Sequence, residues 1–255
     1  MPEDLIPELR LHQMEGCVAV QADQSERETM FLLALAAEYR EIKGVVGWLD
    51  LCSPVVLERL EYFSQFEKLC GFRHIAQSEP DDRFLVREDF VRGVRQLGRF
   101  HYTFDILIYP RQLPAAIELV EKIPDQRFVL DHMAKPAIRA VEIEQWAKQT
   151  RVLAANPNVY CKASGLVTEA DWHKWRDSEF TPYLDVVFDA FGPDRIMFGS
   201  DWPVCLVAGK YGKVKELLSN YVRDLPVDEQ KKIFGLNAVS FYGLKMKGHE
   251  PATAR

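Results

Sequence analysis

The chain has 255 residues and a formal charge of −6, with 47% hydrophobic and 27% charged residues. This balance excludes a disordered or fibrous chain, and no apolar run reaches the ~20 residues that a membrane helix needs. A mildly acidic surface also argues against sequence-independent nucleic-acid binding, which requires a basic face. The expected partner is therefore a small-molecule substrate, not nucleic acid or a membrane, and homo-oligomerisation is left open.

The cysteines indicate the cellular compartment. There are five of them, an odd number, and no two form a CxxC pair. Most sit in or beside apolar runs, as small buried hydrophobic residues do. This usage is typical of a reducing compartment rather than of a disulfide-stabilised fold. The first ten residues, MPEDLIPELR, also lack the apolar core of a signal peptide, so we expect a cytoplasmic protein.

Short apolar runs rich in β-branched and aromatic residues recur along the chain and predict seven strands. Each run is continuous rather than alternating, which is typical of a strand buried on both faces of a parallel sheet. Successive strands start about 23 to 37 residues apart, the length of one βα unit. The predicted strands are Cys17–Gln21, Val45–Leu51, Gly71–Ala76, Phe104–Tyr109, Arg127–His132, Asn158–Lys162 and Arg195–Ser200.

The segments around these strands predict helices. Ser25 and Glu28 form a capping box before the apolar-rich run Met30–Tyr39, and Ser53 with Pro54 predicts the start of the next helix. The later predicted helices are Arg87–Leu97, Leu113–Lys122, Val141–Ala155, Glu179–Phe191 and Lys210–Val222. At the two ends of the chain, we expect a helix over Pro2–Glu15 and two short closing helices over Asp228–Leu244.

Strict alternation of strands and helices predicts a parallel sheet with helices outside it. Two architectures satisfy this pattern, a closed (β/α)8 barrel and an open doubly wound sheet. Neither GxGxxG nor GxxxxGK[ST] occurs, so the phosphate-binding signatures of open sheets are missing. A TIM-type barrel is therefore favoured, as a single domain over residues 1–255. Because seven strands are predicted and a helix precedes the first, we expect this α/β barrel to lack its first strand.

In such a barrel, functional side chains lie at the C-terminal ends of the strands and in the loops that follow. Polar side chains at these positions are costly unless they are paired or used. They are Gln21, Trp48, Asp50, Arg73, His74, Tyr109, Asp131, His132, Lys162, Ser200, Asp201 and Trp202.

His132 and Asp201 are the candidate catalytic residues. His132, in FVLDHMAKP, can orient water, polarise a carbonyl or bind a metal. The alternative is a structural histidine bonded to the backbone. Asp201, in FGSDWPV, can take a proton from an attacking water or hold a metal, and the alternative is a carboxylate that caps its own loop.

Arg73 and Lys162 are cations at two strand ends and are candidate ligands of a substrate carboxylate or an oxyanion. The alternative is a salt bridge within the barrel mouth, with Asp50 or Asp131 as partner. His74 directly follows Arg73, so their side chains point to opposite faces of the strand. One of the two therefore faces the barrel interior, and the sequence leaves open which.

Trp48, Trp202 and Tyr109 are candidate walls of a site for a ring-shaped ligand, with packing beneath loops as the alternative. Other catalytic signatures are missing, since the sequence contains no HExxH and no HxH motif. No GxSxG elbow occurs either, so neither Ser164 nor Ser200 is expected to be a nucleophile.

Seven segments occur in a characteristic order: VAVQA, GVVGWLDL, GFRHIAQSEPD, FDILIYPRQL, FVLDHMAKP, NVYCKASGLVTE and RIMFGSDWPV. Together they resemble the amidohydrolase-related family, in the branch that contains sugar-lactone hydrolases such as L-fuconolactonase and L-rhamnonolactonase. The resemblance covers about residues 5–244, and GSDWPV together with DHxxKP carries most of its specificity. It implies a (β/α)8 barrel that hydrolyses small lactones.

The resemblance also implies roles for single residues. Asp201 matches the general base toward water, and His132 matches a residue that orients water or substrate. Lys162 and Arg73 resemble ligands of substrate oxygens or a carboxylate, and His74 belongs to the same GxRH motif. The family's His-x-His motif on its first strand is missing here, and a metal held by His132 and Asp201 alone has two protein ligands where catalytic zinc usually has three. We therefore expect no cofactor, or one weakly held divalent metal resembling zinc.

The main hypothesis is a hydrolase that opens a small sugar-derived lactone. Asp201 activates water for attack on the ring carbonyl, and Lys162, Arg73 or His132 holds the developing oxyanion. A second hypothesis is metal-dependent decarboxylation or another hydrolysis on the same barrel. A third, of a different class, is a truncated or catalytically weak barrel or a binding protein, without the His-x-His motif.

Overall fold

A computed structural model describes residues 1–246, which form seven strands and ten α-helices. The strands are β1 (Cys17–Val20), β2 (Ile42–Gly47), β3 (Leu69–His74), β4 (Thr103–Ile106), β5 (Phe128–Leu130), β6 (Val159–Ala163) and β7 (Ile196–Phe198). The helices are α1 (Pro2–Leu11), α2 (Glu26–Glu38), α3 (Val56–Phe63), α4 (Glu88–Leu97), α5 (Leu113–Lys122), α6 (Glu144–Ala154), α7 (Asp177–Phe191), α8 (Tyr211–Tyr221), α9 (Val227–Lys231) and α10 (Asn237–Tyr242). Within the described residues, none of these helices combines the length and apolar character that crossing a membrane requires.

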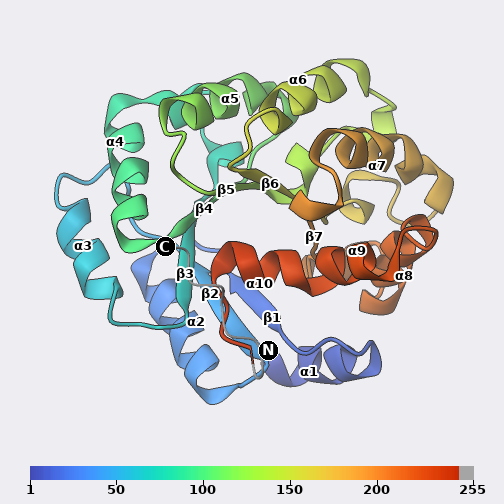
Figure 1. The fold of residues 1–255 in the computed structure, drawn as a ribbon, viewed down its shortest axis with the longest axis horizontal. Coiled ribbons are helices and arrows are strands. Elements are labelled where there is room, and N and C mark those ends of the chain that lie inside the picture. Colours follow the sequence, from blue (N-terminus) through green and yellow to red (C-terminus); the bar gives the residue numbers. More distant parts are fainter. Residues whose placement is uncertain (247–255) are drawn as a thin grey trace.

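The strands form one parallel sheet in which each strand pairs with the next one in the chain. Within residues 1–246, β1 pairs with β2 and β7 pairs with β6, so both are outer strands of the sheet. Figure 1 shows that the sheet is curled and that helices surround its outer face. The predicted parallel α/β fold of TIM-barrel type is confirmed. Its parallel strands bring the loops after them together at one end of the molecule.

Alternate side chains of the strands pack outward against the helices. Phe104 of β4 contacts Phe90 of α4 and Phe128 of β5, with ring centroids 5.8 and 6.2 Å apart. All three rings are fully buried. The inward side chains Val46, Val129 and Met197 of β2, β5 and β7 are buried as well. These strands therefore have the continuous apolar sequences expected of a sheet that is buried on both faces.

Helix α10 closes the end of the sheet at which the strands begin. Phe241 and Tyr242 of this helix, with Leu244, form a buried cluster with the inward-facing side chains Val46, Val129 and Met197. Arg127, directly before β5, donates to the Phe241 carbonyl at 2.8 Å. In Figure 1, α10 lies across the strands. The chemistry is therefore left to the opposite end, where the strands finish.

Two helices begin later than the sequence predicts. Helix α3 starts at Val56 because Ser53 lies in a turn, where its Oγ accepts the Val55 N–H at 3.3 Å. Helix α6 starts at Glu144 because Val141 has a φ of 58°, a left-handed conformation that ends the preceding turn. The two predicted closing helices are α9 and α10, and a π-helical turn, Lys232–Leu236, joins them.

Candidate active site

The loops after β5, β6 and β7 bring three polar side chains together, those of His132, Ser164 and Asp201. The Nδ1 atom of His132 lies 2.9 Å from Ser164 Oγ. Its Nε2 atom lies 3.8 Å from Asp201 Oδ1. The two predicted catalytic residues are thus neighbours. The His132 imidazole contacts the Ser164 hydroxyl through Nδ1 and faces the Asp201 carboxylate with Nε2.

The backbone that carries His132 and Asp201 is left-handed. The four consecutive residues 132–135 have φ angles between 51° and 59°, and Asp201 has a φ of 54°. None of these residues is glycine, and each costs about 1–2 kcal/mol in this conformation. Such strain persists only where the surrounding structure enforces it, and it clusters at functional sites. His132 and Asp201 both lie on backbone that is strained in this way.

Burial determines the charge state of His132. Its side chain is 12% exposed and that of Asp201 is 15% exposed. Burial lowers the pKa of the His132 ring, although the Asp201 and Asp131 carboxylates oppose this shift. The neutral imidazole therefore prevails at neutral pH, with one nitrogen as donor and the other as acceptor. A neutral imidazole beside a carboxylate can bind a water or a carbonyl oxygen and move a proton.

A buried network of charges lies inside the sheet, next to this pair. Asp131 Oδ2 contacts Arg73 Nη1 at 2.8 Å, and Asp131 Oδ1 contacts Lys162 Nζ at 2.7 Å. The Lys162 ammonium also contacts Asp105 Oδ2 at 2.6 Å. The Tyr242 hydroxyl, from α10, donates to the same Asp105 oxygen at 2.8 Å. Two cations and two carboxylates balance, which compensates for the cost of burying each charge.

Burial and charge pairing act in opposite directions on the pKa values of this network. Burial raises the pKa of Asp131, but Lys162 and Arg73 outweigh it and hold that pKa well below its usual range. At Asp105, burial prevails over the attraction of Lys162, and with repulsion from Asp131 the pKa rises to about 6. Burial lowers the pKa of Lys162, but the two carboxylates outweigh it and raise that pKa. Asp131, Asp105 and Lys162 are therefore mainly charged at neutral pH.

The structure places Arg73 and Lys162, two predicted substrate ligands, in ion pairs with Asp131. The other partner considered, Asp50, is exposed and accepts the Cys52 N–H at 3.0 Å. Lys162 lies within β6 rather than at its end, and its side chain points into the sheet interior. Direct contact of Arg73 and Lys162 with substrate stays a prediction.

His74 faces the helices, and Arg73 faces the interior of the sheet. The His74 ring stacks on Phe84 with centroids 4.7 Å apart, and its Nε2 lies 2.7 Å from Glu79 Oε1. Burial lowers the pKa of His74, although Glu79 opposes this shift. Trp48 donates from its indole nitrogen to His74 Nδ1 at 3.4 Å. Trp48 and His74 therefore form a pair after β2 and at the end of β3, and their contact with substrate stays a prediction.

Trp202, the remaining predicted residue, follows Asp201 directly. It is half-buried against the main hydrophobic core, and its backbone N–H donates to Ser200 Oγ at 3.3 Å. Nearby, the Trp175 indole donates to the Ala208 carbonyl at 2.8 Å. This bond ties the loop after β6 to the loop after β7, so the two loops that flank the site are connected.

Sequence comparison places the chain in a family. The sequence profile of the amidohydrolases matches residues 2–244. The chain belongs to the amidohydrolase family. An L-fucono-1,5-lactonase of Burkholderia multivorans is 41% identical to this amidohydrolase, over 100% of this chain and 88% of the relative. An L-fucono-1,5-lactonase of Burkholderia ambifaria is 35% identical, over 94% of this chain and 84% of the relative.

A solved structure agrees with the sequence comparisons. A crystal structure of an amidohydrolase from Burkholderia multivorans with bound zinc superimposes with a TM-score of 0.93 at 40% identity. The match covers 96% of this chain and 89% of that chain. The resemblance drawn from the sequence motifs is therefore confirmed.

Two residues of the charge network in this amidohydrolase were not predicted from the sequence. Asp105 is an acidic residue within the apolar run FDILIY, and an acidic side chain in a buried strand needs a cationic partner. An acidic residue within an apolar run is therefore the sequence signal that could have identified Asp105. Tyr242 lies 137 residues further along the chain, and no local pattern connects it with Asp105. Ser164, which the sequence did not mark as a site residue, belongs to the site as the partner of His132.

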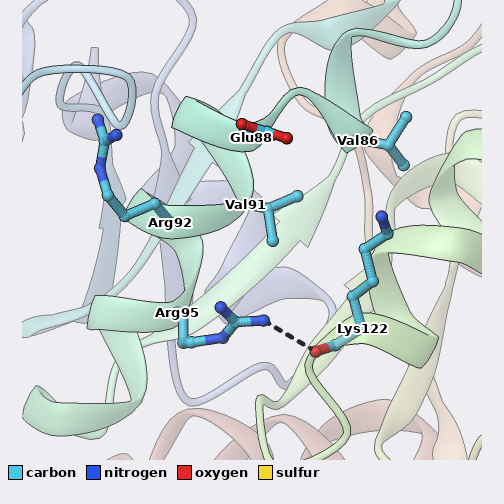
Figure 2. Close-up of a pocket in the computed structure, with 6 residues that line it drawn as sticks. All are labelled: Val86, Glu88, Val91, Arg92, Arg95 and Lys122. Carbon is cyan, nitrogen blue, oxygen red and sulfur yellow. Dashed lines mark hydrogen bonds between the residues drawn. The ribbon is translucent and has the colours of Figure 1, made fainter.

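Figure 2 shows a cavity of about 360 Å³ that lies between α4 and the end of α5. Val86 and Val91 form its apolar part. Arg95 donates to the Lys122 carbonyl at 3.2 Å, and Arg92 donates to the Cys52 carbonyl at 3.2 Å. The cavity contains none of the predicted site residues, and backbone carbonyls already engage both guanidinium groups. We assign the chemistry to the strand ends rather than to this cavity.

The described side chains of this amidohydrolase do not fit a zinc centre. His132 Nε2 and Asp201 Oδ1, 3.8 Å apart, are two donors that face each other. Catalytic zinc usually has three protein ligands. Within residues 1–246, no three side chains of His, Cys, Asp or Glu are grouped so as to hold a metal ion.

Proposed function

We propose that this amidohydrolase opens small sugar-derived lactones by hydrolysis at the site of His132 and Asp201. The observation that carries the proposal is the pair itself, a buried imidazole and a carboxylate 3.8 Å apart on left-handed backbone at two strand ends. Identities of 41% and 35% to L-fucono-1,5-lactonases support a sugar lactone as the substrate.

Asp201 acts as the general base. It takes a proton from water while the water oxygen forms a bond to the carbonyl carbon of the lactone ring. The bond between that carbon and the ring oxygen then breaks. The ring oxygen takes the proton from Asp201 and leaves as a hydroxyl group of the sugar acid. Each turnover consumes one water and restores the carboxylate, and a positioned base of this kind contributes about 10²–10⁴ in rate.

His132 holds the carbonyl oxygen as negative charge develops on it. The alternatives, Arg73 and Lys162, already bond to buried carboxylates. Their first role is to hold Asp131, which directly precedes His132 in the chain. Arg73 keeps a buried Nε–H that has no partner within the described residues. We assign to it, and to Lys162, a second role toward the hydroxyl groups of the substrate.

The aromatic residues near the site complete the proposal. Trp202, beside Asp201, and Trp48, paired with His74, contact the sugar ring. Polar groups in the surrounding loops bond to the ring hydroxyls, since a site built for hydroxyl groups rejects analogues that lack them. A small-molecule substrate is the proposed partner, and homo-oligomerisation is left open.

We also propose that the sheet is a (β/α)8-type barrel without its first strand and that the chain is one domain. The packing of α1 supports this arrangement. A Cβ atom on Gly212 of α8 would lie 2.6 Å from the His12 ring, directly after α1. The end of α1 and helix α8 are therefore in contact, on the side of the sheet where β1 and β7 are the outer strands.

His132 and Asp201 act through their own side chains, because a divalent ion held by these two residues alone would have fewer protein ligands than catalytic zinc usually has. A cytoplasmic location is supported by cysteine chemistry, since all five cysteines are free thiols and reduced cysteines are typical of that compartment.

Initial rates of lactone opening test the proposed function. The substrates are L-fucono-1,5-lactone and δ-valerolactone, which has the same ring size and no hydroxyl groups. We expect kcat/KM to be at least about 100-fold higher for the sugar lactone. Elemental analysis of the same sample reports its metal content. A rate no higher than spontaneous opening for sugar lactones would refute the proposal. Tightly bound metal in such an inactive sample would favour the metal-dependent alternative.

A further inference from the structure

Ser164 contacts His132 but takes no part in the reaction steps above. Its Oγ lies 2.9 Å from His132 Nδ1 and 3.5 Å from the Lys162 carbonyl oxygen, and the residue is 3% exposed. A serine hydroxyl has one proton to donate, and the imidazole nitrogen is much the nearer acceptor. Donation to Nδ1 leaves the ring's own proton on Nε2, the nitrogen that faces Asp201.

Two glycines keep this contact close. A Cβ atom on Gly165 would lie 2.7 Å from the Cγ and Nδ1 atoms of His132. A Cβ atom on Gly199 would lie 2.8 Å from the Cβ of Ser164. Any side chain at either position would push the imidazole or the serine away. The loops after β6 and β7 are therefore shaped around the Ser164–His132 pair.

The carboxylate on the other side of the ring favours the same tautomer. Asp201 Oδ1 lies 3.8 Å from His132 Nε2, which is too far for a hydrogen bond. It is near enough for the negative charge to favour an N–H over a lone pair at Nε2. Within residues 1–246, this N–H has no acceptor at hydrogen-bond distance. The donor is thus available to a ligand.

We propose that Ser164 is a positioning residue that holds His132 as the Nε2–H tautomer. The proposal rests on the proposed function for the identity of the ligand, a lactone carbonyl oxygen, but the tautomer is a property of the free protein. Without the hydroxyl, part of the molecules carry the proton on Nδ1 and present a lone pair to that oxygen. Because a lone pair repels the developing oxyanion, kcat falls more than KM rises.

Nitrogen-15 NMR of the histidine rings at pH 7.5 tests the tautomer without any substrate. The signals of His132 are those missing from the spectrum of His132→Gln. We expect a protonated Nε2 in the wild type, a shift toward protonated Nδ1 in Ser164→Ala, and an intermediate state in Ser164→Cys, whose thiol is a weaker donor. Ser219→Ala is the control, since its hydroxyl donates to the Lys215 carbonyl on the outer helix α8, and it leaves the His132 signals unchanged.

Kinetics on a sugar lactone complete the test. We expect Ser164→Ala to lower kcat roughly tenfold to a hundredfold with little change in KM, and Ser164→Cys to recover part of the loss. A wild-type His132 protonated on Nδ1, or an unchanged tautomer and kcat in Ser164→Ala, overturns the proposal. The wild-type spectrum decides the tautomer even where Ser164→Ala does not fold. An Nε2–H tautomer in a protein that opens no lactone refutes the proposed function and supports the role of Ser164.

Discussion

Asp131→Asn tests the buried charge network by removing one of its two negative charges at almost constant volume. Asp131 is fully buried and holds Arg73 at 2.8 Å and Lys162 at 2.7 Å. After the substitution, two buried cations share one carboxylate, that of Asp105. Breaking a buried ion pair from one side costs about 3–5 kcal/mol, because a charge is left uncompensated. We expect about 3 kcal/mol, the lower end, because Lys162 keeps its contact with Asp105.

Urea unfolding followed by circular dichroism measures this loss as a lower midpoint at constant m-value. A chain of this size should also lose roughly 6–12 °C in Tm. Asp194→Asn is the matched control, because Asp194 pairs with Lys232 at 2.6 Å on the exposed surface. Exposed ion pairs contribute little, so this variant should unfold like the wild type.

A second substitution separates charge from shape. Arg73→Met in the Asp131→Asn background removes the excess cation and keeps a long side chain in the interior. We expect this double variant to be more stable than Asp131→Asn alone, because the buried charges balance again. Asp131→Asn with wild-type stability, or a double variant less stable than the single one, would refute the reasoning.

Three further predictions concern single residues. Gly165→Ala should lower both the stability and the lactonase rate, because its Cβ meets the His132 ring at 2.7 Å. Gly243→Ala is the control, since Gly243 has a similar φ of 63° and open space around it, and it should lose about 1 kcal/mol of stability and no rate. Urea unfolding measures the stability of the two variants, and kcat measures their rates. Tyr242→Phe should lose about 1–3 kcal/mol in urea unfolding, since it removes the hydrogen bond to the buried Asp105 carboxylate, and an unchanged midpoint would contradict this. Because the folded pKa of Asp105 is raised to about 6, the folded state holds the extra proton between about pH 4 and 6. The stability of the wild type relative to Asp105→Asn should therefore fall as the pH rises through this window, and a relative stability that rises would contradict the direction of the shift.

The parallel sheet and the proximity of His132 and Asp201 could be predicted from the sequence because both depend on local signals. Each strand is a continuous apolar run, and β–α alternation leaves few ways to arrange such runs. His132 and Asp201 stand directly after two of these runs, so the fold alone brings them to the same end of the sheet. Their motifs, DHMAKP and GSDWPV, also carry the family resemblance.

Other features depend on tertiary contacts that no local pattern contains. Arg73 and His74 alternate across β3, and the residue that faces inward is decided by how β3 pairs with its neighbours. The partner of Lys162 in the next strand but one, Asp105, reads as part of an apolar run. Tyr242 reaches that carboxylate from the last helix. In the structure, Arg73 and Lys162 are therefore paired with buried carboxylates next to the site.

The role of Asp201 as general base is the central claim, and kcat of Asp201→Asn on a sugar lactone tests it most directly. Circular dichroism and urea unfolding confirm that the variant is folded. Asp194→Asn is measured beside it, because Asp194 lies before β7, at the opposite end of that strand from Asp201, in an exposed ion pair. We predict that kcat of Asp201→Asn falls at least about 100-fold after subtraction of spontaneous opening, while Asp194→Asn keeps its rate. Full wild-type kcat in folded Asp201→Asn would contradict the account.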